Sequence, residues 1–353
     1  VGWLSVGPGC GGASRSPIGS SGSGGAPEID SGSAPAGSGG ATATDGDVAD
    51  RGEAAALADA APETAGTGGA PAPDAAPDVV TVRTLCPPGP FEMPRPGASR
   101  AVCAGVVRYN WNEGPAWVAS QGAFFFTNFP NMTFDTGDII KYTPGTGACE
   151  IFIEGARCNG LAPTIDGNII GACQGSRAVV KYDLATKQAT TLASMAEGKL
   201  LGQPNDLVQH TNGTIYFSSP AVRPGRPAGL DAAVLRIDPA GGVSVIAFGY
   251  SNGIALSPDE RRLYVVGQGL WDLDTQGLPS NKRAFTLGGD GIAVDCAGNV
   301  YDNGGNITSA QGQKIGAFPA GTNMSFGGPD GKMLLVVANQ TARVIDMNLP
   351  GLP

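Results

Sequence analysis

The sequence contains a single histidine, His210, and this scarcity argues against several kinds of active site. A Ser-His-Asp triad needs a histidine beside its nucleophile, and zinc sites commonly use histidine ligands. His210 stands two residues before the expected turn at Asn212-Gly213. We interpret it as a side chain at the end of a turn, so neither histidine-based catalysis nor a histidine zinc site is expected.

Basic residues are also scarce. Lys and Arg number 22 against 31 Asp and Glu, which gives a net charge of -9. No stretch gathers the basic side chains into a patch, and nucleic-acid binding needs such clustering to neutralise phosphates. A nucleic-acid partner is therefore not expected. No run approaches the roughly 20 apolar residues that a membrane-spanning helix needs, so no transmembrane segment is expected either.

Large apolar side chains are nearly missing from the first 78 residues. This segment consists mainly of Gly, Ala, Ser, Pro, Thr and Asp, and such a composition cannot bury enough surface to offset its ordering entropy. We expect residues 1–78 to form a disordered tether and residues 79–353 to form the folded domain. Cys10 is the cysteine of this tether. One hypothesis is that it carries a lipid anchor after export, and the alternative is an incidental cysteine.

The folded domain carries the other six cysteines. In an exported protein they could form disulfides, which persist in oxidising compartments, and we expect a periplasmic, cell-surface or extracellular location. The alternative is free cysteine buried as a small apolar side chain. Sequence does not determine the connectivity, and the pairs we favour are Cys86 with Cys103 and Cys158 with Cys173. The six are Cys86, Cys103, Cys149, Cys158, Cys173 and Cys296.

Long segments with helical periodicity are absent after residue 79. Short apolar runs alternate with Asp-Gly, Asn-Gly and Pro-Asp turns, a pattern typical of all-β domains. A unit of polar residue, short strand, turn and second strand recurs six times, at intervals of about 33 to 47 residues that fit four-stranded propeller blades. We predict an all-β, six-bladed β-propeller over residues 79–353, expected to be monomeric. Ala104–Tyr109 is predicted as a strand, and the segment before Glu113 should close the ring by pairing with the last blade.

One polar residue begins each repeat. If the first strand of every repeat lines a central channel, these residues form a ring at one mouth of that channel. All six carry oxygen and none carries sulfur or imidazole, and carboxylate and amide oxygens are the ligands that hard divalent cations prefer, above all Ca²⁺. The sequence therefore predicts a site for one divalent cation. The ring residues are Glu113, Asn159, Asn205, Asn252, Asp290 and Asn323.

Each ring position also has a purely structural interpretation. Asn-Gly and Asp-Gly form tight corners because these residues tolerate a left-handed backbone, and a single repeat would be explained by that alone. The combination of Glu in one repeat, Asp in another and Asn in the rest favours a site. Trp111 and Phe129 lie near the ring in sequence and could line a pocket, although core packing is the simpler role for aromatic residues in strands.

The repeat motifs, in their order and spacing, resemble the family of gluconolactonase, senescence marker protein (regucalcin) and luciferin-regenerating enzyme. The resemblance covers about residues 104–345 and implies a six-bladed propeller with one divalent metal, usually calcium, at the channel mouth. It also implies hydrolysis of sugar lactones or related esters. The motifs that carry it are Glu113-Gly114-Pro115-Ala116-Trp117, Pro204-Asn205-Asp206-Leu207, Ser251-Asn252-Gly253-Ile254-Ala255 and Asp290-Gly291-Ile292-Ala293.

Roles for individual residues follow from this resemblance. Glu113, Asn252 and Asp290 would be metal ligands, and Asp290 would also act as general base. Asn205 would be a further ligand or a substrate contact, and Asn159 would face the substrate. The metal would polarise the lactone carbonyl for attack by water.

The sequence departs from the family pattern around the substrate. Many relatives carry Asp where this chain has Asn128 and Ser219, and some place Arg where Gln203 stands. The identity of the lactone or ester is therefore left open. The alternative function is a non-catalytic, metal-stabilised propeller that serves as a surface binding module.

Overall fold

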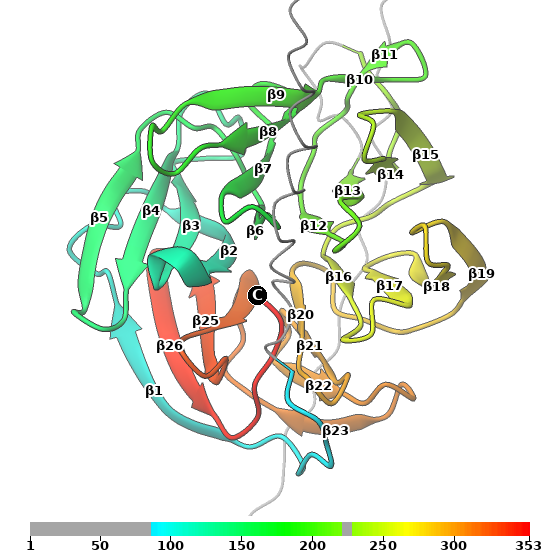
Figure 1. The fold of residues 1–353 in the computed structure, drawn as a ribbon. Helices are drawn as coiled ribbons and strands as arrows, with labels where there is room; N and C mark the ends of the chain where they lie inside the picture. The colour runs from blue at the N-terminus through cyan, green and yellow to red at the C-terminus, as the bar shows by residue number, and fades with distance from the viewer. Residues whose placement is uncertain (1–85, 221–227) are drawn as a thin grey trace, which may run out of the picture. The chain divides into compact units, whose positions relative to one another are not determined.

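The computed structural model, which describes residues 86–220 and 228–353, contains six four-stranded antiparallel sheets. Figure 1 shows them side by side around a central axis, with one strand of each sheet innermost. The predicted six-bladed β-propeller is confirmed. From the innermost strand outward, the first blade consists of β2 (Trp111–Val118), β3 (Ala123–Phe129), β4 (Asp138–Thr143) and β5 (Ala148–Ile153). The second consists of β6 (Leu161–Pro163), β7 (Ile169–Cys173), β8 (Ala178–Tyr182) and β9 (Ala189–Ala193). The third consists of β12 (Leu207–Gln209), β13 (Ile215–Ser219), β14 (Ala233–Ile237) and β15 (Val243–Phe248).

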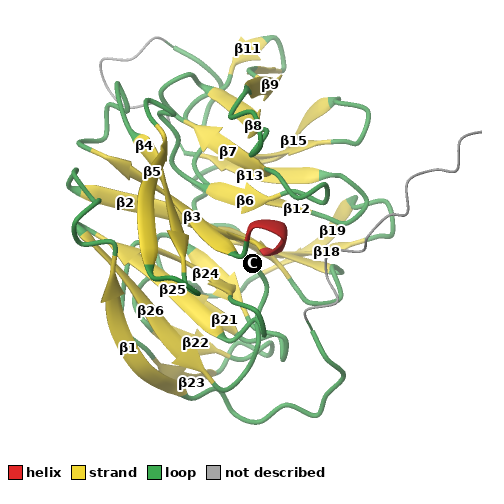
Figure 2. Ribbon diagram, turned by 60° about the vertical axis from the view of Figure 1, so that its left-hand side comes forward, coloured by secondary structure: helices red, strands yellow, loops and turns green. Residues whose placement is uncertain are grey.

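The remaining blades follow the same plan, with one exception in the sixth. The fourth and fifth blades are β16 (Ile254–Leu256), β17 (Arg262–Val265), β18 (Gly269–Leu273) and β19 (Pro279–Arg283); and β20 (Ile292–Val294), β21 (Val300–Asp302), β22 (Asn306–Thr308) and β23 (Lys314–Ala317). The sixth is β24 (Asn323–Gly327), β25 (Met333–Ala338), β26 (Thr341–Met347) and, outermost, β1 (Pro96–Val102). A short hairpin, β10 (Met195–Ala196) and β11 (Lys199–Leu200), forms a separate two-stranded sheet. A 3-10 turn, η1 (Ala119–Gln121), connects β2 to β3 and is drawn red in Figure 2.

Burial decreases from the middle of each blade to its outer edge. The second strands β3, β7 and β13 are buried along their whole length, whereas β19 is mostly exposed. A strand covered by neighbouring sheets on both faces reads as a continuous apolar run, as Phe124–Phe126 does. The core lies between blades, where Phe125 of the first blade belongs to one cluster with Ile169 of the second.

The chain closes the ring by pairing its beginning with its end. Strand β1 runs antiparallel to β26, with Ser99 opposite Ile345. Closure by the segment before Glu113 is thus confirmed. The strand predicted at Ala104–Tyr109 is wrong, because the backbone turns at Cys103, where φ is 60° and the carbonyl accepts a hydrogen bond from the Val106 amide at 2.9 Å.

Three disulfides join the six cysteines of the described residues. The predicted pair Cys158–Cys173 is confirmed. The predicted pair Cys86–Cys103 is wrong, because Cys103 follows the outermost strand of the sixth blade and meets Cys149 on the neighbouring outer strand β5. Cys86 instead bonds to Cys296 of the fifth blade, at a sequence separation of 210.

The predicted tether over residues 1–78 and its Cys10 lie outside the described residues. Within the part of the chain that the structure describes, no helix is long and apolar enough to cross a membrane.

Candidate functional site

The innermost strands bring the six predicted ring residues to one mouth of the channel. Asn159, Asn205, Asn252 and Asp290 each stand two residues before their inner strand. Asn323 is the first residue of β24, and Glu113 is the third residue of β2. The common position follows from the repeat, because each inner strand begins after a corner that crosses the top of its blade.

Glycines after the ring residues let neighbouring blades approach closely. The Gly160 amide donates to the Asn205 carbonyl at 2.7 Å, and a Cβ atom on Gly160 would lie 2.4 Å from Asp206 Oδ1. On the other side of the ring, a Cβ atom on Gly291 would lie 2.1 Å from Asn323 Cγ. Any larger residue at either glycine would push the ring side chains apart.

Threonine hydroxyls link two further pairs of neighbouring blades. Thr127 Oγ1 lies 2.7 Å from the Asn159 carbonyl and 3.2 Å from the Glu113 carbonyl, so it ties the first blade to the second. Thr322 Oγ1 donates to the Asn112 carbonyl at 2.7 Å and ties the sixth blade to the first. These hydrogen bonds to the backbone join neighbouring blades without using the side chains of the six ring residues.

Three carboxylates occupy this mouth, and they repel one another. Burial raises the pKa of Glu113 well above its ordinary value, and the charges of Asp290 and Asp206 raise it further. Burial also raises the pKa of Asp206 to about 7, with a contribution from the charge of Asp290, and raises that of Asp290 to about 6. Desolvation and like charge both disfavour the ionised forms. A bound cation would reverse this preference.

Hydrogen bonds only partly offset that repulsion. Asn323 Nδ2 lies 3.0 and 3.1 Å from the two carboxylate oxygens of Asp206, and the amide of Asn323 also lowers the pKa of Glu113. The Asn252 amide does the same for Asp290. Asn323 therefore serves the carboxylates as a donor, and its own Oδ1 accepts from the Met324 amide at 2.8 Å.

Three amide oxygens of the ring are buried without a hydrogen-bond partner: Asn159 Oδ1, Asn205 Oδ1 and Asn252 Oδ1. An unsatisfied buried acceptor is costly, and three in one ring with carboxylates beside them suit an oxygen-binding cation such as Ca²⁺. Among the residues that the structure describes, no three His, Cys, Asp or Glu side chains are grouped to hold a metal. A cation at this mouth would therefore need the asparagine oxygens as ligands in addition to carboxylates, and three such oxygens are free to bind it.

Asp206 is the ring residue that the sequence prediction missed. It follows Asn205 at the position where the first, second, fourth and fifth repeats have glycine, so this corner carries a carboxylate beside its ring asparagine. The signal was present, because aligning the repeats shows an acid in a glycine column. A prediction that takes one ring residue from each repeat does not include it.

The channel below the ring is narrow. Its cavity has a volume of about 50 Å³, with apolar walls from the inner strands and with Asp206 and Asn323 at the ring. Leu352 lies at the opposite end, where its amide donates to the Val294 carbonyl at 2.9 Å. A sugar-sized ligand would consequently have to bind above the ring rather than inside the channel.

The two aromatic residues predicted to line a pocket have different surroundings. Trp111 is half-buried at the start of β2, opposite Phe129 in the register. Phe129 has no exposed surface, and its ring centroid lies 4.3 Å from that of Phe134. Contact between Phe129 and a substrate would require this ring to leave the core.

Two serines, Ser218 and Ser219, support the corner of the third blade. Ser218 Oγ accepts from the Asp206 amide at 3.1 Å, and Ser219 Oγ accepts from the Gln203 amide at 3.0 Å. Both hydroxyls thus fix the backbone on either side of Asn205.

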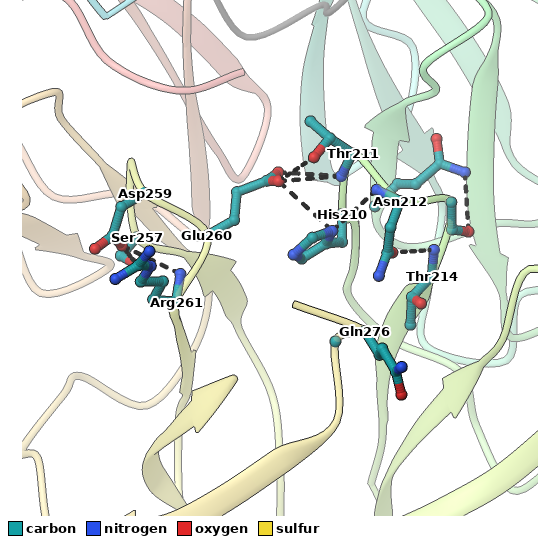
Figure 3. A network of polar contacts seen from close by, with 12 residues as sticks. His210, Thr211, Asn212, Thr214, Ser257, Asp259, Glu260, Arg261 and Gln276 are labelled. Atoms are coloured by element: carbon teal, nitrogen blue, oxygen red, sulfur yellow. Dashed lines mark hydrogen bonds and ion pairs between the residues drawn. The ribbon is translucent and has the colours of Figure 1, made fainter. Parts of the chain in front are cut away.

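His210 lies in the turn after β12, at the end of the strand away from Asn205. Its Nδ1 accepts from the Asn212 amide at 3.0 Å and lies 3.5 Å from Glu260 Oε2 (Figure 3). Glu260 also accepts from the Thr211 amide at 3.2 Å, so this cluster connects turns of the third and fourth blades. The interpretation of His210 as a turn-end side chain is confirmed.

A protein-family model and a known protein of the same kind both match this chain. A model of the SMP-30/Gluconolactonase/LRE-like region matches residues 111–340. A gluconolactonase of Zymomonas mobilis subsp. mobilis is 32% identical over a 229-residue alignment, with 54% of this chain and 64% of that protein covered. The alignment therefore spans less than two thirds of that relative's length.

Solved structures show the same fold. A gluconolactonase from Xanthomonas campestris matches with a TM-score of 0.62 and 24% identity, covering 75% of this chain and 99% of that one. The calcium-binding protein regucalcin from Agrobacterium tumefaciens matches with a TM-score of 0.57 and 19% identity, covering 72% and 95%.

Proposed function

Because the chain belongs to the SMP-30/Gluconolactonase/LRE-like family, we propose that it hydrolyses a sugar lactone or a related ester with the help of one divalent cation, for which Ca²⁺ is the best candidate. The observation that carries this proposal is the ring of three unpartnered amide oxygens beside buried carboxylates. The 32% identical gluconolactonase supports the reaction class, and the calcium-binding regucalcin supports the choice of cation.

Glu113, Asn205, Asn252 and Asp290 would hold the cation. They provide two carboxylates and two amide oxygens, and the buried, unpartnered Oδ1 atoms of Asn205 and Asn252 would gain the contacts that they lack. Calcium takes six to eight oxygen ligands, so water or substrate oxygens would complete the set. Bound there, the cation would polarise the substrate carbonyl as a Lewis acid.

Asp290 would act as the general base. Its pKa of about 6 leaves it largely ionised at neutral pH, and a cation beside it would favour that form further. The carboxylate accepts a proton from the water that attacks the carbonyl carbon, and the proton passes to the ring oxygen that leaves. The product is a hydroxy acid, and the base is regenerated.

Substrate contacts would come from the mouth above the ring. Asn159 and Asn205 can offer amide hydrogens to substrate oxygens, and Trp111 is half-buried at the start of the neighbouring strand β2. The three disulfides support an exported location, because disulfides persist in oxidising compartments.

The decisive experiment is a panel of sugar lactones and esters assayed with Ca²⁺ and with chelator. Turnover that requires the cation and is lost in Asp290→Ala would support the hydrolase. Calcium-dependent thermal stabilisation without turnover of any substrate would favour the binding module instead. Purified protein that binds no divalent cation would contradict both versions of the site.

A further inference from the structure

Tyr250 is an exposed aromatic residue that the fold holds firmly beside the ring. It lies in the loop between β15 and β16, two residues before Asn252, and is 52% exposed. Its ring packs on Gly267, where an added Cβ atom would lie 2.5 Å from Tyr250 Cδ1. Gln268 Nε2 donates to its carbonyl oxygen at 2.9 Å. An exposed tyrosine with this much local support is not a freely rotating surface side chain.

The Tyr250 hydroxyl makes two contacts that bridge the fourth and fifth blades. It donates to the Gly289 carbonyl at 3.0 Å, and Asn252 Nδ2 lies 3.3 Å from the same oxygen. Gly289 directly precedes Asp290. One hydroxyl therefore connects the corners that carry two of the proposed cation ligands.

These contacts determine which end of the Asn252 amide faces which partner. A carbonyl can only accept, so the single hydroxyl proton of Tyr250 is committed to Gly289. Toward Asn252 the Tyr250 oxygen can therefore only accept a hydrogen bond, and the donor must be the NH₂ end of the Asn252 amide. Asn252 Oδ1 is then the end left over, and it is the buried oxygen without a partner.

We propose that Tyr250 is a positioning residue for the cation site, an inference that rests on the proposed function. Its hydroxyl fixes the Asn252 side chain so that Oδ1, rather than Nδ2, is presented to the cation. Without that hydroxyl the Asn252 amide keeps only its hydrogen bond to Asp290, which is itself a proposed cation ligand. The amide can then more readily rotate by half a turn and offer an NH₂ group, which cannot bind a cation. Groups that orient metal ligands in this way commonly change metal affinity by about 10- to 100-fold.

The first test compares calcium binding by calorimetry in the wild type and Tyr250→Phe, which keeps the ring and removes only the hydroxyl. We expect about tenfold weaker binding in the variant. The matched control is Tyr216→Phe, because the Tyr216 hydroxyl of the third blade also donates to a backbone carbonyl, that of Gly277 between β18 and β19 of the fourth blade. This control should lower thermal stability and leave calcium affinity unchanged.

A double-mutant cycle separates amide orientation from a general loss of stability. Asp at position 252 has oxygen at both ends, so its orientation does not matter. In an Asn252→Asp background, Tyr250→Phe should change calcium affinity by less than about twofold, because the two residues are coupled through an amide orientation that Asp no longer has. An equal loss in both backgrounds, or no loss in the single variant, would overturn the role of Tyr250 and leave the cation site standing. Absence of calcium binding by the wild type would overturn the site itself.

Discussion

Asn323 and Asp206 meet across the channel mouth, although they are 117 residues apart and belong to the sixth and third blades, which face each other in a six-bladed ring. Asn323 Nδ2 lies 3.0 and 3.1 Å from the two Asp206 oxygens. An amide that approaches both oxygens of a buried carboxylate stabilises its charged form. The hydrogen bond from Asn323 thus favours the charged form of a third carboxylate, Asp206, in a site where Glu113 and Asp290 repel that charge.

Asp206→Asn should stabilise the cation-free protein and weaken calcium binding. The substitution removes a buried charge that interacts unfavourably with Asp290, while its Oδ1 can still accept from Asn323. Removing one desolvated like charge should raise the free energy of unfolding by about 1 kcal/mol near pH 8, the scale of a one-unit pKa shift. Urea unfolding in chelator measures the first effect, and calcium titration measures the second. A less stable variant with unchanged affinity would contradict this account of Asp206.

Asp290→Asn should reduce lactone or ester hydrolysis by at least about 100-fold, because the variant has no base to accept the proton of the attacking water. A pH-stat assay measures the rate directly. Asp330→Asn is the matched control, since Asp330 is exposed in the turn between β24 and β25 and accepts only from the Lys332 amide in its own turn. Equal rates in the two variants would exclude Asp290 as the base.

The stability of the cation-free protein should fall as pH rises from about 4 to about 7. In the folded state the pKa of Asp206 is about 7 and that of Asp290 about 6, whereas an unfolded Asp titrates near 3.9. The folded state binds more protons over this interval, and stability then decreases with pH. Thermal unfolding in chelator at several pH values measures the trend.

Calcium should reverse that dependence, because it binds the ionised carboxylates and its affinity should rise over the same interval. The Asp206→Asn variant provides the control, since the slope in chelator should become shallower when one of the two groups is removed. A cation-free protein that grows more stable between pH 4 and pH 7 would show that these carboxylates are ionised without cost.

The ring was predictable from sequence because its determinants are local. Each of Asn159, Asn252 and Asp290 is followed by glycine and a short apolar strand, and the repeat places such corners at equal height. Family membership was predictable for the same reason. The bond between Asn323 and Asp206 was not, because it depends on which side chains meet across a closed ring.

The predictions from sequence are wrong where contacts with distant segments determine the local structure. Ala104–Tyr109 has the apolar composition of a strand, but the turn at Cys103 directs this segment away from the sixth blade, where β1 has already filled the outer edge. The pairing of Cys103 with Cys149 follows from that placement. Only Cys158 and Cys173 lie on neighbouring parts of one blade, and only their pairing could be anticipated.

Removing the Cys86–Cys296 disulfide should lower the free energy of unfolding by about 2 to 5 kcal/mol. The bond joins residues 210 positions apart, and cross-links that close long loops restrict the unfolded chain most. It also fastens the segment before β1 to the fifth blade, beyond the closure that β1 makes with β26. The double variant Cys86→Ser, Cys296→Ser avoids a free thiol, and urea unfolding of both proteins measures the loss.

The control for this prediction is the Cys158→Ser, Cys173→Ser variant, whose bond spans a separation of only 15 residues. If the stabilisation by a disulfide grows with the logarithm of the loop length, removing Cys158–Cys173 should lower the free energy of unfolding by about 2 kcal/mol less than removing Cys86–Cys296. Calcium affinity should be unchanged when Cys86 and Cys296 are replaced, because Cys296 lies beyond β20, at the end of the strand away from Asp290. Loss of calcium binding in that variant would show that the bond shapes the ring as well as the blade.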